Sequence, residues 1–116
     1  MRKIKITAGS VEMTATLNDS KTANALWDIL PAANGARIWG DEIYFPIPMN
    51  MPEDGARASV PSGTIAFWPP GSAFCIFFGQ TPASPVNVVG TLDGDPEKFR
   101  KVRDGETVNL EKASEE

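Results

Sequence analysis

The side chains that could carry out chemistry in this sequence are few, and none of them is a histidine. Arg37, the neighbouring Asp41 and Glu42, and the single cysteine, Cys75, are the main candidates. Without histidine the chain has neither Ser-His-Asp nor Cys-His activation of a nucleophile, and no His-based metal site. Catalysis would have to rest on carboxylates, Lys, Arg, Tyr or on positioning alone. We therefore expect no bound metal and no cofactor.

Each candidate also has a plain structural interpretation. Cys75 lies in the apolar run FCIFF with no base close to it in sequence, so we expect a buried, inert thiol rather than a nucleophile. Asp41 and Glu42 are adjacent at a turn and a strand start, where they point in different directions. This favours turn formation and solvation over an acid–base pair. Arg37 is either a surface salt-bridge residue or the anchor of a ligand.

Composition restricts the classes of partner. The chain has 116 residues and a net charge of −4, with 41% hydrophobic and 22% charged residues. These values predict one globular domain without a basic surface for nucleic acid or anionic membranes. The N-terminal stretch lacks the unbroken apolar run of a signal peptide, and no later segment could span a bilayer. One cysteine allows no internal disulfide, so we expect a cytoplasmic protein; the sequence indicates no oligomeric state.

Hydrophobic periodicity places these residues on a mainly β framework. Alternating segments predict strands at residues 3–7, 11–17, 36–39, 42–47, 63–68, 73–78, 86–92 and 106–112. Caps and a single apolar face predict short helices near 20–30 and 96–102, with Leu26 and Trp27 buried. Residues 49–62, rich in Pro, Gly and Ser, read as a surface loop. We expect a single domain over residues 1–111 and a solvated tail over 112–116.

The stretch FWPPGSAFCIFF, residues 67–78, has more apolar residues than one face of a strand requires. Phe74, Ile76 and Phe78 point to one side of a strand, and Cys75 and Phe77 to the other. One set must fill the interior. The other set either lies under a covering segment or forms the floor of an apolar pocket.

Four motifs along the chain carry a resemblance to a known family: WGDEIYF at 39–45, WPPG at 68–71, FCIFFG at 74–79 and VNVVG at 86–90. Together they resemble the small cyclophilin-like proteins of bacteria and archaea, whose function is not established. The resemblance covers nearly the whole chain. It implies the fold of the prolyl isomerase cyclophilin, a closed β-barrel of about eight strands with two short capping helices.

The resemblance also suggests positions for a site. Matched without gaps to true cyclophilins, Arg37 stands at the catalytic arginine, and Phe45, Ala73 and Val86 replace the polar pocket residues. Trp68 replaces a small residue that lines the proline slot. The binding residues implied in this way are Arg37, Ile43, Phe45, Trp68, Cys75 and Phe77.

Three functions follow from this reading. The first is a barrel that binds a small apolar ligand or a proline-containing peptide segment beside Arg37, Phe45 and Trp68, without strong catalysis. The second is a weak peptidyl-prolyl cis–trans isomerase in which Arg37 donates to the prolyl nitrogen. The third is a protein-interaction or structural module. The chain is therefore expected not to be an enzyme, with isomerisation as the activity if it is one.

Overall fold

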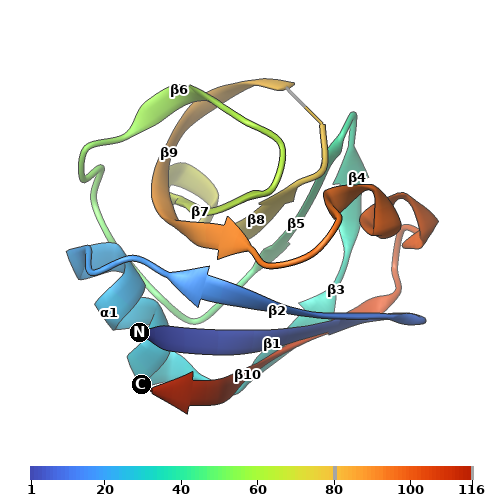
Figure 1. The fold of residues 1–116 in the computed structure, drawn as a ribbon. Helices are drawn as coiled ribbons and strands as arrows, with labels where there is room; N and C mark the ends of the chain where they lie inside the picture. Colours follow the sequence, from blue (N-terminus) through green and yellow to red (C-terminus); the bar gives the residue numbers. More distant parts are fainter. Residues whose placement is uncertain (80, 116) are drawn as a thin grey trace.

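A computed structural model describes residues 1–79 and 81–115 of the chain, and it is built mainly of antiparallel strands (Figure 1). The strands are β1 (Arg2–Ala8), β2 (Val11–Leu17), β3 (Ala32–Gly35), β4 (Arg37–Trp39), β5 (Glu42–Pro46), β6 (Arg57–Val60), β7 (Thr64–Trp68), β8 (Ala73–Phe77), β9 (Thr81–Leu92) and β10 (Thr107–Glu115). The helical elements are α1 (Lys21–Ile29) and the 3-10 helices η1 (Pro69–Gly71) and η2 (Pro96–Lys101). Among the described residues, none of these helices is both long and apolar enough to cross a bilayer.

The ten strands form one sheet that curls strongly, but its hydrogen bonding does not close into a barrel. The strand order is β3-β10-β1-β2-β9-β7-β8-β5-β4, with β6 paired to β9. The two end strands, β3 and β4, are separated only by Ala36, so the chain joins them covalently and no described pairing links them. Ala36 itself continues the ladder, accepting from Gly105 and donating to the Glu106 carbonyl at 2.7 Å each. The expected closed barrel of about eight strands is thus corrected to an open ten-stranded sheet.

The caps anticipated from the sequence are present. The Ser20 hydroxyl accepts from the backbone N–H of Ala23 at 3.1 Å and begins α1. The Asp95 carboxylate accepts from the N–H of Glu97 at 3.0 Å and begins η2, which is a 3-10 helix. Helices are therefore confirmed at both expected places.

Other boundaries differ from the expectations. β6 lies within residues 49–62, which were expected to be a loop, and β3 was not anticipated. Both are short and mostly exposed or half-buried, so they lack the apolar alternation that identifies a strand. β9 starts earlier than expected, and β10 continues through residues 112–115, where Arg2 pairs with Glu115. The side chains of that last stretch are exposed, as a tail would be, although the backbone is paired.

Buried apolar side chains form two clusters on opposite faces of the sheet. The main core fills the space enclosed by the curled sheet and α1. A second cluster lies between β6 and the outer face of the β5–β8–β7 sheet, and its buried members are Val60, Ala66, Cys75, Phe77 and Val86. Figure 1 shows β6 beside β9, with the chain after β6 curving round to enter β7.

A buried amide holds the segment that leads into β6. Asn87, 1% exposed, donates to the Pro52 carbonyl at 2.9 Å and to the Thr22 hydroxyl at 3.1 Å. Its side-chain oxygen accepts from the backbone N–H of Asp54 at 2.9 Å. Because a buried amide is costly unless its groups are paired, these bonds fix the loop against β9 and α1.

We expect Trp27→Ala to lower the free energy of unfolding by roughly 3–5 kcal/mol. Trp27 is 6% exposed, and Leu26 beside it is 1% exposed. Arg2 and Lys112 each lie 5.1 Å from the centre of a Trp27 ring, so truncation removes core packing and two cation–π contacts. Denaturant unfolding measures the loss. Trp39→Ala is the matched control, because Trp39 is 57% exposed. A Trp27→Ala loss below about 1 kcal/mol, typical of an exposed site, would contradict this placement.

Candidate functional site

The outer face of the sheet carries a cavity of about 240 Å³ beside the second cluster. Its walls come from four strands: β4, β5, β7 and β9. The lining residues are Trp39, Glu42, Tyr44, Trp68, Ser84 and Val86. Three aromatic rings therefore stand around one carboxyl group.

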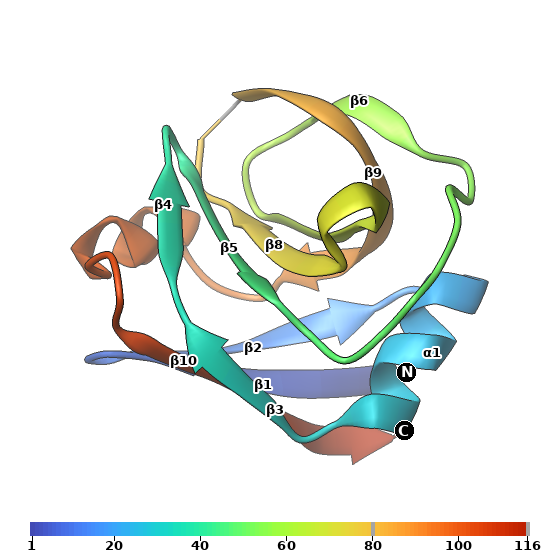
Figure 2. The same cartoon turned by 180° about the vertical axis from the view of Figure 1, so that it is seen from behind.

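Strand pairing explains why these side chains share a face. In an antiparallel pair, directly opposed residues point to the same side of the sheet. β4 and β5, side by side in Figure 2, place Trp39 opposite Glu42 and Arg37 opposite Tyr44. Ile38 lies opposite Ile43, and this intervening pair points to the main core. The two-residue turn at residues 40–41 thus sets the cavity-facing side of both strands.

Glu42 is the unusual member of the cavity wall. It is only 8% exposed, and burial raises its pKa above the ordinary value of 4.5. The Cys75 thiol beside it opposes this effect as a hydrogen-bond partner. Among the described residues, no lysine or arginine forms an ion pair with Glu42. A carboxyl group that is not paired with a cation of the described chain therefore borders the cavity.

Cys75 lies under the cavity rather than in its wall. Its side chain is 1% exposed in the second cluster, and its Sγ lies 3.9 Å from the Ala73 carbonyl oxygen. Burial raises the pKa of the thiol well above its usual value, and the nearby Glu42 carboxylate raises it further. The burial of Cys75 expected from the sequence is confirmed. Because the thiolate is the nucleophile, this setting disfavours reaction of the thiol.

Trp68 closes one side of the cavity through a close approach to η1. A Cβ atom on Gly71 would lie 2.5 Å from the Trp68 ring, so glycine is required for the ring to lie against this turn. The indole Nε1 is buried and has no hydrogen-bond partner among the described residues. The ring is held by packing rather than by a polar contact.

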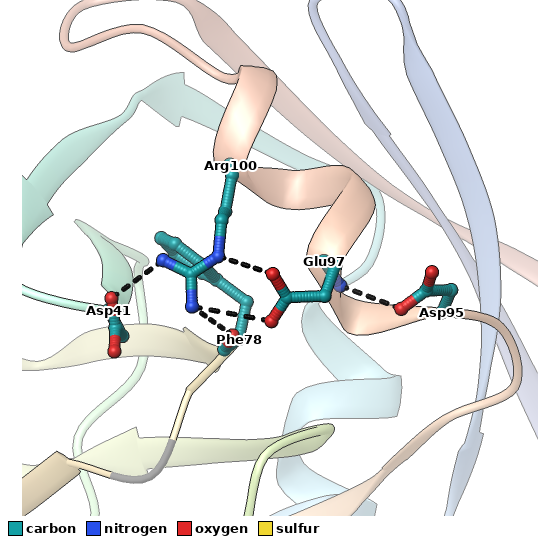
Figure 3. A network of polar contacts seen from close by, with 5 residues as sticks. All are labelled: Asp41, Phe78, Asp95, Glu97 and Arg100. Carbon is teal, nitrogen blue, oxygen red and sulfur yellow. Dashed lines mark hydrogen bonds and ion pairs between the residues drawn. The ribbon is translucent and has the colours of Figure 1, made fainter.

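The turn that carries Trp39 and Glu42 is held from the outside by Arg100 of η2 (Figure 3). The guanidinium donates to Asp41 at 2.8 Å and to the Phe78 carbonyl oxygen at 3.3 Å, and it also binds Glu97. It lies 5.2 Å from the centre of the Phe78 ring. Hydrogen bonds to Glu97 and Asp41 raise the pKa of Arg100. Asp41 therefore points to η2 and Glu42 to the cavity, in the different directions that the sequence indicated.

The predicted site residues do not lie together. Ile43 and Phe45 are 0% exposed in the main core, on the opposite face of the sheet. Trp68 lines the cavity, with Cys75 and Phe77 buried in the second cluster below it. Arg37 is exposed on the cavity face but is not part of the cavity wall.

The reason lies in the alternation of the strand. Arg37 shares a face with the even-numbered residues Glu42 and Tyr44, whereas the gapless match selected the odd-numbered Ile43 and Phe45. Tyr44 and Glu42 were consequently not predicted as wall residues of the cavity. The signal that identifies them is the period-2 pattern counted outwards from the turn at residues 40–41.

Metal binding finds no support in the part of the chain that the structure describes. No group of three or more Cys, Asp or Glu side chains is gathered there as a metal site would require.

Comparison with known proteins agrees with this architecture. The family model described as Cyclophilin-like matches residues 2–111. The chain belongs to the Cyclophilin-like family. A hypothetical protein of Archaeoglobus fulgidus, known from a solution structure, is 34% identical, with a TM-score of 0.81 and coverage of 97% of this chain and 95% of that one. No curated protein matches the sequence.

A second structural neighbour shares only the fold. The structure of McbB in complex with tryptophan has a TM-score of 0.65 and 19% identity. The match covers 97% of this chain and 45% of McbB. The Cyclophilin-like fold therefore also occurs as part of a longer protein.

We expect Cys75 in the native Cyclophilin-like chain to react with a thiol reagent at pH 8 roughly 100-fold or more slowly than in denaturant, because reaction requires local opening. The thiol is buried and its raised pKa disfavours the thiolate. A chromogenic disulfide reagent measures both rates. Equal rates would show that the second cluster is open to solvent.

The titration of Glu42 predicts a pH dependence of stability. Because its pKa is raised in the folded state, the folded chain holds this proton more tightly than the unfolded chain. The contribution of Glu42 to the free energy of unfolding is fully present below the pKa of the unfolded chain. It is lost as pH rises through the pKa of Glu42 in the folded chain. The stability of Glu42→Gln relative to wild type should therefore increase as pH rises above about 4.5, the ordinary value.

Unfolding free energies of both proteins between pH 4 and pH 8 measure this difference, and groups common to both cancel. Glu12→Gln, at an exposed carboxylate on β2 that pairs with Lys5, is the control for removal of a surface carboxylate. A difference that shrinks with rising pH for Glu42→Gln would contradict the direction of the shift.

Proposed function

We propose that this Cyclophilin-like protein binds a small ligand in the cavity of β4, β5, β7 and β9, and that it is not an efficient prolyl isomerase. The observation that carries the proposal is the cavity itself, with aromatic walls around the buried Glu42. Ligand sites are mainly apolar concavities with a few placed polar groups, and this composition fits that description. A buried carboxyl group that no ion pair explains is also typical of functional sites.

The size of the cavity limits the ligand. At about 240 Å³ it is smaller than the roughly 300–1,000 Å³ of pockets that enclose drug-sized molecules. It is large enough for a compact group, such as a single side chain or the head of a small molecule. A long peptide segment would have to lie mostly outside it.

Three features argue against efficient isomerisation. The barrier to prolyl rotation is about 18–20 kcal/mol, and lowering it requires a donor placed at the prolyl nitrogen. Arg37 is exposed and does not line the cavity. Ala73 and Val86 stand where the resemblance places polar pocket residues and have no side-chain hydrogen bonds to offer. By the resemblance, Trp68 stands where a small residue lines the proline slot, and its bulk would hinder entry of a proline ring.

On a standard proline tetrapeptide we expect an isomerisation rate at least roughly 100-fold below that of a true cyclophilin. The protease-coupled assay compares wild type with Arg37→Ala and Trp68→Ala. Strong wild-type activity abolished by Arg37→Ala would overturn the proposal and establish the isomerase. Activity that arises only in Trp68→Ala would support the view that the indole fills the slot.

The binding function is tested by screening a library of small amines, acids and neutral apolar compounds against the isotope-labelled chain. Amide resonances of residues 39–44 and 84–88 should shift with bound compounds, and Trp39→Ala should weaken the effect. Shifts confined to other surfaces, or none with any class, would refute a binding site here.

A further inference from the structure

We propose that the group bound in this cavity is an alkylammonium: a protonated or methylated amine, carried by a free small molecule or by a lysine side chain. This inference rests on the binding function proposed above and names the chemical class of the ligand. It follows from the combination of one desolvated carboxyl group with three aromatic residues.

The first argument is charge. Glu42 is 8% exposed, lines the cavity, and forms no ion pair with any described residue. The carboxylate–cation pairs of the described chain all lie at the surface, with side chains 29–67% exposed. A buried carboxylate is unfavourable unless a positive charge or hydrogen-bond donors compensate it. A cation entering the cavity would provide that compensation, whereas an anion would be repelled.

The second argument is the aromatic wall. Trp39, Tyr44 and Trp68 surround the space next to Glu42, and Trp39 is 57% exposed at its edge. Aromatic rings attract cations through their negative faces, and several rings around one site select ammonium groups with attached alkyl carbons.

The cation–π contacts found among the described residues lie away from the cavity. Arg2 and Lys112 lie over Trp27, and Arg100 lies over Phe78. Among the described residues, no lysine or arginine lies over Trp39, Tyr44 or Trp68 in the same way. The aromatic residues of the cavity are therefore available to a cation from outside.

Other ligand classes fit less well. A divalent metal needs several oxygen, nitrogen or sulfur ligands, and no such group is gathered among residues 1–79 and 81–115. A purely apolar ligand would leave Glu42 without a cation, with only the weak Cys75 thiol as a hydrogen-bond partner. The volume of about 240 Å³ suits a compact alkylammonium better than a large planar molecule.

The test compares choline with 3,3-dimethylbutan-1-ol, in which a neutral carbon replaces the charged nitrogen. Calorimetric or NMR titration of the wild-type chain should show choline binding at least tenfold more tightly. Glu42→Gln should weaken choline binding at least tenfold, whereas its affinity for the neutral compound should stay within about twofold of wild type. That retained binding also shows that the variant has folded its cavity.

Two controls separate local from general effects. Glu12→Gln removes one negative charge from an exposed position and should leave choline affinity within about twofold of wild type. Trp39→Ala should weaken choline binding at least fivefold. Equal loss in Glu12→Gln and Glu42→Gln would mean that only the net charge of −4 attracts the cation, which overturns the inference.

The outcomes also separate this inference from the proposed function. Equal binding of choline and its neutral analogue at the cavity would refute the cation but keep the binding function. No binding of any compound class at the cavity would refute both.

The source of the ammonium is decided by a third arm. A short peptide containing trimethyllysine is titrated beside choline, with a matched peptide containing norleucine. If the trimethyllysine peptide binds at least tenfold more tightly than choline, and the norleucine peptide does not bind, the ligand is a lysine side chain of another protein. If the trimethyllysine peptide and choline bind equally tightly, the ligand is a free small molecule. Binding of the norleucine peptide as tightly as the trimethyllysine peptide would contradict recognition of the charge.

Discussion

Burial of β8 on both faces is the constraint on which the rest of this structure depends. All five of its residues are buried, although most strands of an antiparallel sheet have one face in solvent. Phe74 and Ile76 enter the main core, and Cys75 and Phe77 enter the second cluster. This burial on both faces explains why FWPPGSAFCIFF is so rich in apolar residues. A second apolar face requires a cover, and β6, paired to β9, supplies it.

That cover reaches only part of the outer face, and the cavity lies where it ends. β9 runs twelve residues and pairs with β6, β7 and β2 in turn, so it must bend sharply. At Gly90 a Cβ atom would lie 2.2 Å from the Thr16 carbonyl oxygen, so a side chain cannot be accommodated where β9 crosses β2. Asn87 holds the loop before β6 to the same strand. β9 thus determines how far the cover extends and leaves Ser84 and Val86 in the cavity wall.

The sequence was sufficient to predict most strands, both helices and the burial of Leu26 and Trp27, because alternation and caps are local signals. It could not predict that the two end strands of the curled sheet, β3 and β4, remain unpaired with each other, since strand pairing depends on contacts between distant segments. The predicted binding residues on β5 and the residues that line the cavity differ by one position along the strand. A gapless match treated Ile43 and Phe45 as pocket residues, whereas the turn at residues 40–41 directs Glu42 and Tyr44 to that face. Because the side-chain period of a strand is two, a shift of one residue exchanges core and surface completely.

The polar groups around the cavity differ in what they contribute to stability. Arg100 satisfies Asp41 and a carbonyl oxygen from outside, and so fixes the turn in the orientation that buries Glu42. Folding alone does not require a carboxyl group at that position, because a neutral residue of similar size would avoid the desolvation that raises the pKa of Glu42. Proteins break such local rules mainly at functional sites, and this agrees with the binding role proposed above for Glu42. Glu42 is therefore kept at the cavity, next to solvent but only 8% exposed. Three features contribute to this placement: the packing of the second cluster, the turn held by Arg100 and the aromatic walls.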